Sequence, residues 1–251
     1  MRIPKIIIDS TDYHTTGSDI AVTGQNFHHL SRVLRCEIGD TIEIFFQNAQ
    51  AFRAVISQIG TESLSVKLLQ EKTTPATKNI TLICGYPKPT TAEFIVEKAV
   101  EIGISELHFF FADRSQTRLQ GEQLSKKLAR LEKIKDSALK QSGLVGQITK
   151  LCYHNSLKDT LSQPADNQDN SRLKMIFVPP DEAPHSSNAA ELVQSKSQTD
   201  SYTIIVGPEG GLCEQEIELA KSYGFTEASL GNKILRVETA VIASGMLIQL
   251  L

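Results

Sequence analysis

Two glycine turns near the carboxyl end constrain the fold of this chain more than any other feature. The first, Gly207-Pro208-Glu209-Gly210-Gly211, ends the apolar run 202–206, and the second begins at Leu230-Gly231 after a short run at 226–230. This pattern predicts two buried strands that stop at sharp turns, with helices at about 214–223 and at the end of the chain. Because paired turns at strand ends form a crevice in open α/β sheets, we expect a ligand site there.

The first turn brings backbone groups close to a ligand. Its three glycines lack Cβ atoms, and Pro208 fixes one φ angle. A phosphate loop requires GxxxxGK[ST] and a dinucleotide site requires GxGxxG, and this turn matches neither. Glu214, Glu216 and Glu218 follow at the positive end of the next helix, which disfavours a phosphate. The turn therefore predicts a binding loop for another kind of ligand.

Both turns together resemble the cofactor-binding end of the SPOUT methyltransferases. GPEGG is followed about twenty residues later by LGNKILRVETA, residues 230–240, and the LR-x-ETA spelling is similar to that of the bacterial 16S ribosomal RNA uridine N3-methyltransferase family. The resemblance implies S-adenosylmethionine as cofactor, a C-terminal trefoil knot and a homodimer that completes the site. It also implies the small ribosomal subunit as partner, with uridine 1498 as the target.

The resemblance also implies which residues form the site. The predicted cofactor residues are Gly207, Glu209, Gly210, Gly211, Leu230, Gly231, Leu235, Arg236, Thr239 and Ala240. Methylation of uridine N3 removes an imide proton, so the protein must supply a cation near O2 or O4, or a proton acceptor. Arg114 and Arg236 are the predicted cations, and Glu238 is the predicted acceptor with Glu209 as an alternative. A purely structural role for Glu238 in the first turn of the last helix stays open.

A polar segment with a proline, Lys72–Lys78, divides the chain into predicted domains 1–72 and 73–251. Apolar or alternating runs at 6–8, 41–46, 51–56 and 63–69 predict a small β-barrel with one helix at 25–34, which resembles the PUA-like RNA-binding domain. From residue 79 onward, strand and helix patterns alternate, and one predicted helix at 91–102 starts with a Thr90/Glu93 capping box and buries Phe94. The second domain is therefore predicted to be α/β, with a mainly parallel sheet covered on both faces.

Basic residues in three places are predicted RNA contacts. In the first helix, three of them lie at helical spacing on one side, and others follow the strand 107–111 or form a stripe on a helix at 122–141. A solvated surface is the alternative in each place, and for Arg114 it is an ion pair. The predicted contacts are His28, His29, Arg32, Arg35, Arg114, Arg118, Lys126 and Arg130.

Composition limits the classes of protein that this chain can belong to. A net charge of −3 among 251 residues excludes binding of nucleic acid by bulk charge, so any RNA contact must be local. The four cysteines, Cys36, Cys84, Cys152 and Cys213, lie far apart, which predicts buried thiols and no metal site. We expect no membrane span and no signal peptide, and hence a cytoplasmic protein.

The chain departs from the family pattern at three positions, and two of them, Lys140 and Leu144, keep other functions open. Lys140 and Leu144 replace a glutamate and an arginine, and Cys213 replaces a serine that would cap the helix 214–223, at an expected cost of about 1 kcal/mol. The alternatives are a related SPOUT methyltransferase that acts on ribose 2′-OH or on transfer RNA, and a non-catalytic RNA-binding factor in ribosome assembly.

Overall fold

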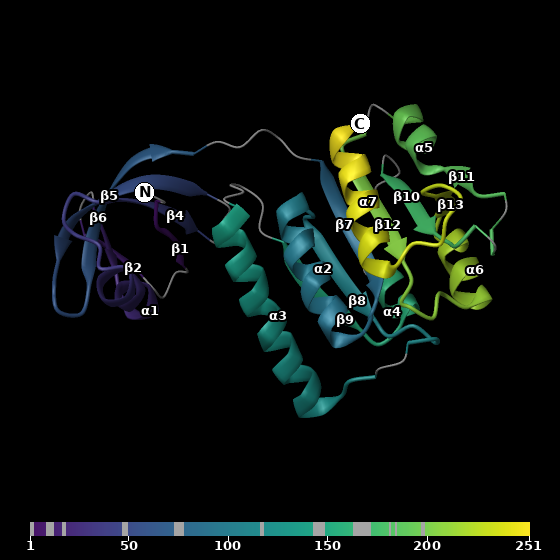
Figure 1. Ribbon diagram of the computed structural model, residues 1–251, viewed down its shortest axis with the longest axis horizontal. Helices are drawn as coiled ribbons and strands as arrows, with labels where there is room; N and C mark the ends of the chain where they lie inside the picture. Colours follow the sequence, from purple (N-terminus) through teal and green to yellow (C-terminus); the bar gives the residue numbers. More distant parts are fainter. Residues whose placement is uncertain are drawn as a thin grey trace. The chain divides into compact units, whose positions relative to one another are not determined.

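The computed structural model describes residues 3–8, 13–16, 19–46, 50–72, 78–115, 118–142, 149–162, 172–180, 182–183, 185–196 and 199–251. Figure 1 shows these residues as a ribbon. They form two compact units, one of Met1–Pro75 with Leu139–Ile148 and the other of Ala76–Ala138 with Thr149–Leu251. The division at residue 75 lies within the polar segment 72–78.

The amino-terminal unit is a six-stranded curled sheet with the order β1-β4-β5-β6-β3-β2. Alternate residues of its strands point into one apolar core, which includes Ile6, Ile44 and Val66. The strands β2 and β3 were missed in the sequence because their short segments, YHTT and DIAV, lack a run of large apolar residues like the one in β1. No pairing among the described residues closes β1 onto β2, so the unit is a half-barrel. Its strands are β1 (Lys5–Ile8), β2 (Tyr13–Thr16), β3 (Asp19–Val22), β4 (Thr41–Phe46), β5 (Ala51–Ile59) and β6 (Leu64–Glu71).

The helix predicted at 25–34 is only in part an α-helix. The α-helix α1 (Gly24–His28) passes directly into a π-helix, η1 (His29–Val33), in which the Leu34 amide donates to the His29 carbonyl at 2.9 Å. Arg35 then ends the segment with φ 54°, a left-handed conformation that costs a non-glycine residue about 1–2 kcal/mol. The predicted α-helical alignment of His28, Arg32 and Arg35 was therefore wrong, although all three side chains are exposed.

The carboxyl-terminal unit contains a seven-stranded sheet in which every pair of neighbouring strands is parallel. This confirms the α/β class predicted from residue 79 onward. The strand order is β11-β13-β10-β12-β7-β8-β9. The strands are β7 (Asn79–Gly85), β8 (Glu106–Phe110), β9 (Lys150–His154), β10 (Leu173–Phe177), β11 (Ser187–Asn188), β12 (Ser201–Val206) and β13 (Thr226–Ser229).

Helices cover both faces of this sheet. On β12, Tyr202 and Ile204 pack into the core shared with α2 and α7, whereas Ile205 packs into the core shared with α4 and α6. Burial on both faces explains why the run 202–206 is almost wholly apolar. In Figure 1, α2 and α7 lie side by side along one face. The helices are α2 (Pro89–Ile102), α3 (Gly121–Ser142), α4 (Leu157–Leu161), α5 (Ala189–Ser195), α6 (Glu214–Ser222) and α7 (Val237–Leu250).

The predicted start of α2 was wrong. Lys88 is the N-cap and Pro89 begins the helix, with no side-chain cap, because proline at the first helical position already lacks the N–H that a cap would satisfy. The Glu93 carboxylate instead accepts a hydrogen bond from Arg130 at 2.8 Å, and this interaction lowers the pKa of Glu93. Phe94 was predicted to be buried but is 41% exposed.

Within the described ranges, no helix is both long enough and apolar enough to cross a membrane.

Candidate functional site

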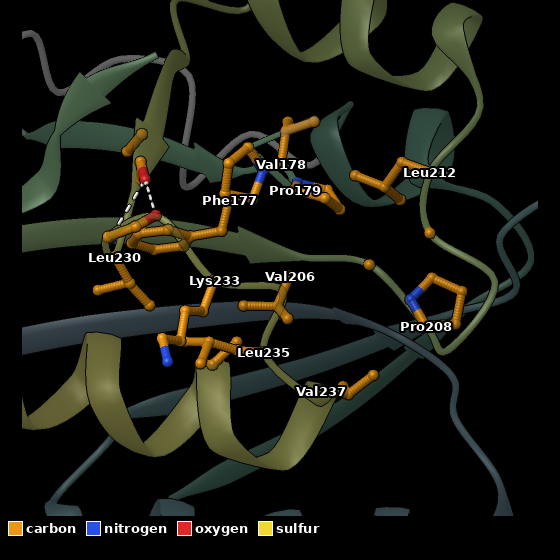
Figure 2. Close-up of a pocket in the computed structure, with 17 residues that line it drawn as sticks. Phe177, Val178, Pro179, Val206, Pro208, Leu212, Leu230, Lys233, Leu235 and Val237 are labelled. Atoms are coloured by element: carbon orange, nitrogen blue, oxygen red, sulfur yellow. Dashed lines mark hydrogen bonds between the residues drawn. The ribbon is translucent and has the colours of Figure 1, made fainter. Parts of the chain in front are cut away.

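A pocket opens where the strands β10, β12 and β13 end, which is the crevice expected from the two glycine turns (Figure 2). Its empty space is about 640 Å³, including the part open to solvent. The residues that line it come from the ends of these strands, the two turns and the start of α7. They are Phe177, Val178, Pro179, Pro180, Val206, Gly207, Pro208, Gly211, Leu212, Ala228, Ser229, Leu230, Gly231, Lys233, Leu235, Val237 and Ala240.

The pocket combines apolar walls with accessible main chain. Phe177, Leu230 and Leu235 supply side-chain surface, and the glycines at 207, 211 and 231 leave backbone groups uncovered. Gly211 and Gly231 have φ angles of 72° and 112°, which only glycine adopts without strain. Ser229 fixes the second turn, because its hydroxyl donates to the Gly231 carbonyl at 2.7 Å and accepts from the Gly231 amide at 3.2 Å. The pocket therefore suits a flat, largely apolar ligand with polar edges.

The structure brings six of the ten predicted cofactor residues to this pocket, namely Gly207, Gly211, Leu230, Gly231, Leu235 and Ala240. The other four, Glu209, Gly210, Arg236 and Thr239, are not among its lining residues. Three of these have a different contact in the structure. The Glu209 carboxylate accepts from the Lys88 amide at 3.0 Å, Gly210 packs on the main chain of Arg114, and the Arg236 carbonyl accepts from the Ala240 amide at 2.8 Å.

Two of the predicted catalytic residues, Arg114 and Glu238, lie next to residues that line the pocket. Arg114 is exposed in the loop after β8, and its Nη1 would lie 3.7 Å from a Cβ placed on Gly211, which lines the pocket. Its guanidinium lies 3.9 Å from the Glu182 carboxylate, so the predicted alternative, an ion pair, is present. Such an exposed pair contributes only about 0–1 kcal/mol and leaves the guanidinium available to a substrate. Glu238 lies in the first turn of α7, where it also complements the helix dipole.

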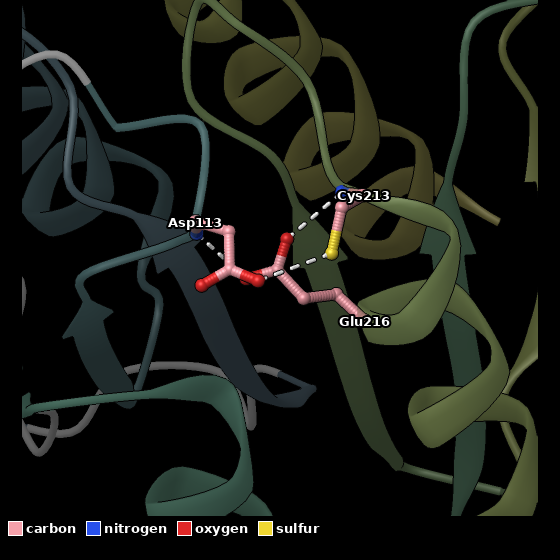
Figure 3. Close-up of side chains that lie close together, drawn as sticks. All are labelled: Asp113, Cys213 and Glu216. Atoms are coloured by element: carbon pink, nitrogen blue, oxygen red, sulfur yellow. Dashed lines mark hydrogen bonds between the residues drawn. The ribbon is translucent and has the colours of Figure 1, made fainter.

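A buried carboxylate, Glu216, joins two loops beside the pocket (Figure 3). Its two oxygens accept from the Cys213 amide at 2.9 Å and from the Asp113 amide at 3.1 Å. The first bond is one half of a capping box. Glu216 therefore stabilises the start of α6, where the replacement of serine by Cys213 was expected to cost stability. The spacing Cys213-x-x-Glu216 was the available signal, and it was missed because cysteine is not a usual N-cap.

We expect Glu216→Ala to destabilise the protein by about 2 kcal/mol, because two partly buried amides lose their acceptor. Urea denaturation measures the free energy of unfolding. The matched control is Glu214→Ala, since Glu214 is exposed in the same helical turn and should cost roughly 0.5 kcal/mol or less. An equal loss for both variants would mean that helix charge, rather than the two amide bonds, carries the effect.

Asp113, Cys213 and Glu216 also form the one group of possible metal ligands among the described residues, with their ligand atoms within 4.8 Å of one another. The Cys213 thiol donates to the Asp113 carboxylate at 3.4 Å. Burial, with a further contribution from Asp113, raises the pKa of the Cys213 thiol, which disfavours the thiolate form that a metal would require. Both oxygens of Glu216 already accept hydrogen bonds from backbone amides. We therefore assign these three residues the role of attaching the loop after β8 to the start of α6.

Some of the predicted RNA contacts have exposed side chains, and others form ion pairs. His28, Arg32 and Arg35 are exposed and His29 is half-buried. On α3, Lys126 pairs with Glu122 at 2.7 Å and Arg130 with Glu93, while Arg118 lies 3.9 Å from Asp113. Lys140 is half-buried in α3, and Leu144 lies outside the described residues.

Comparison with protein families gives two matches that together cover most of the chain. Residues 74–249 match the model of an RNA methyltransferase domain, and residues 22–69 match that of an RNA methyltransferase PUA domain. The match to the methyltransferase domain begins at residue 74, within the polar segment 72–78 in which the two units divide.

Curated relatives and solved structures are similar over nearly their whole length. A protein of Rickettsia conorii named ribosomal RNA small subunit methyltransferase E is 30% identical, with all of this chain and 97% of the relative covered. A protein of the same name from Bacillus subtilis is 26% identical over 88% of this chain and 85% of the relative. A methyltransferase E from Neisseria gonorrhoeae, solved with S-adenosylmethionine bound, is 25% identical with a TM-score of 0.75, covering 97% of this chain and 95% of that chain.

Proposed function

Since this chain belongs to the RNA methyltransferase family whose members carry a PUA domain, we propose that it transfers a methyl group from S-adenosylmethionine to N3 of a uridine in 16S ribosomal RNA. One observation carries the proposal for this chain itself. Its two glycine turns, separated in the sequence, line a single pocket at the carboxyl ends of three parallel strands. Uridine 1498 is the target that we expect from the family.

We propose that the pocket holds the cofactor through main-chain groups of both turns and through the apolar walls. Phe177, Leu230 and Leu235 offer flat contact area for an adenine ring, and the turns at 207–211 and 229–231 offer backbone donors and acceptors for its polar edges. Thr239 and Arg236 lie beside these walls at the start of α7 and complete the proposed site. A side chain on Gly211 or Gly231 would cover the main chain that the ligand needs.

The bound cofactor would supply a methyl group on a positively charged sulfur, so the chain has to provide orientation and charge control. We propose that Arg114 and Arg236 stabilise negative charge on the uracil carbonyl oxygens as the imide proton leaves. The sequence prediction for the proton acceptor is Glu238, in the first turn of α7 next to Arg236. Neither task requires a metal ion.

We propose that the active species is a homodimer. Met246, Leu250 and Leu251 at the end of α7 and Phe94 on α2 are large apolar side chains that remain exposed in one copy, by 39%, 75%, 47% and 41%. Apolar exposure of this kind on packed helices is typical of protein interfaces. The same proposal includes the trefoil knot. It also includes action in the cytoplasm, where small ribosomal subunits are found.

Labelling of small ribosomal subunits tests the proposed function. Purified protein is incubated with methyl-labelled S-adenosylmethionine and 30S subunits that lack the modification, and the labelled nucleoside is then identified. We expect label at N3 of a single uridine. Label on ribose or on transfer RNA would instead support a related methyltransferase, and an absence of label together with retained RNA binding would support an assembly factor.

We expect the double change Arg32→Ala and Arg35→Ala to weaken RNA binding by the amino-terminal unit. Both side chains are exposed at the end of η1, and loss of two phosphate contacts should lower the slope of log affinity against log salt by about 1.4. Binding titrations at several salt concentrations measure this slope. Lys67→Ala, which removes an exposed lysine from β6, is the control and should leave the slope unchanged.

A further inference from the structure

A carboxylate that the sequence did not single out, Glu182, lies at the rim of the pocket. The wall of the pocket continues from β10 through Pro179 and Pro180, and the Glu182 amide donates to the Pro179 carbonyl at 3.0 Å in the following turn. A Cβ placed on Gly211, which lines the pocket, would lie 3.9 Å from the Glu182 Oε1 atom and 3.7 Å from the Arg114 Nη1 atom. The end groups of both side chains thus meet at the same stretch of pocket wall.

Three other carboxylates in the loops that meet at this part of the wall already accept hydrogen bonds. Glu209 accepts a hydrogen bond from the Lys88 amide, and Asp113 accepts one from the Cys213 thiol. Both oxygens of Glu216 accept hydrogen bonds from backbone amides. Within the described part of the chain, the Glu182 carboxylate contacts the Arg114 guanidinium at 3.9 Å, which is longer than a hydrogen bond. Its side chain is 41% exposed. Glu182 therefore keeps its acceptor capacity for an incoming group.

The pair formed by Glu182 and Arg114 matches the edge of a uracil ring. That edge presents one donor, N3–H, between two acceptors, O2 and O4, while a carboxylate only accepts and a guanidinium only donates. We infer that Glu182 accepts the N3 proton during methylation while Arg114 binds the neighbouring carbonyl oxygen. This inference rests on the proposed function and assigns the acid–base role to Glu182 in place of Glu238.

The proposed step balances in atoms and in charge. The N3–H bond breaks and its proton passes to a Glu182 oxygen, while the electron pair on N3 forms the new bond to the methyl carbon. The bond from that carbon to sulfur breaks, and its electron pair stays on sulfur. One positive and one negative charge disappear together, and the proton on Glu182 then passes to water.

Glu182→Gln tests this assignment, because glutamine keeps the size of the side chain but is a far weaker base. We expect the rate of N3 methylation to fall roughly 100-fold near neutral pH, within the usual contribution of a general base. The loss should shrink as pH rises, because the imide then ionises without help. Calorimetric binding of S-adenosylhomocysteine should stay within about threefold of the wild-type value, and Glu182→Asp, which retains a carboxylate, should keep most of the wild-type pH profile.

Several outcomes would overturn the assignment. They are an unchanged rate for Glu182→Gln, a loss that is equal at every pH, a loss explained by weaker cofactor binding, or the pH-dependent loss appearing in Glu238→Gln instead. Glu191→Gln, which changes an exposed glutamate on α5, is the matched control and should behave as wild type. If wild-type protein labels an atom other than N3, the proposed function itself fails, and that result is distinct from any result with the variants.

Discussion

Replacement of Arg114 by alanine should lower the rate of methylation by about 1,000-fold, the upper part of the range for losing one donor that stabilises transition-state charge. The reason is electrostatic, since the imide nitrogen must lose its proton while its carbonyl oxygens take up negative charge. The Arg114 guanidinium lies beside Gly211 at the pocket wall, and its only ion pair among the described residues is the long contact with Glu182. Single-turnover measurements with saturating cofactor and RNA report this step directly.

Binding of the cofactor should survive the same change. Gly210 packs against the carbonyl oxygen and the Cβ atom of Arg114, and alanine keeps both of these atoms. Calorimetry with S-adenosylhomocysteine should therefore give a dissociation constant within about threefold of wild type, a difference below 1 kcal/mol. Lys158→Ala, which removes an exposed lysine on α4, is the control for loss of surface charge. A rate near wild type for Arg114→Ala would show that another cation faces the uracil oxygens.

Replacement of Gly210 by alanine should weaken cofactor binding by at least about tenfold, equivalent to 1.4 kcal/mol. The new Cβ would lie 2.6 Å from the Arg114 carbonyl oxygen, closer than real Cβ atoms approach any neighbour. Because the nearest atom is a backbone oxygen, which cannot turn aside as a flexible side chain could, the turn 207–211 must move away from the loop after β8. Gly207 and Gly211 of that turn line the pocket, so the movement distorts the site.

The appropriate control is Gly224→Ala in the turn after α6. Gly224 has a φ of 84°, and no atom lies within 4 Å of its new Cβ, so the variant is strained but makes no clash. It should lose about 1–2 kcal/mol of stability and bind S-adenosylhomocysteine normally. Gly210→Ala should bind S-adenosylhomocysteine at least about tenfold more weakly in the same titration. Normal binding by Gly210→Ala would show that the turn can shift without harm to the pocket.

Local patterns in the sequence were enough to predict the main elements of the carboxyl-terminal unit. The apolar run 202–206, the two glycine turns and the largely apolar helix α7 each leave a local pattern in the sequence, set by burial or by positive φ angles. The parallel sheet and the position of the crevice follow from the order of these elements. Six of the predicted cofactor residues accordingly line the pocket.

Prediction from sequence failed where two rules compete at the same residues. Thr90 and Glu93 have the spacing of a capping box, but Pro89 begins α2 and Arg130 binds the Glu93 carboxylate. The basic face expected on one α-helix is divided by the π-helical turn His29–Val33, after which Arg35 has a left-handed conformation. Helical spacing describes a regular helix, and it cannot report a change of helix type that the surrounding packing stabilises.

Contacts between residues far apart in the chain were decided only by the tertiary structure. The sequence determined that two sharp turns follow buried strands, because the conformations of glycine and of apolar runs are local properties. It could not determine that Glu209 holds Lys88, that Glu216 holds Asp113 or that Glu182 faces Arg114. Each of these contacts depends on which loops the parallel strand order brings to one edge of the sheet. The residues next to a carboxylate in the sequence are the same whether or not a distant hydrogen-bond donor comes to lie beside it.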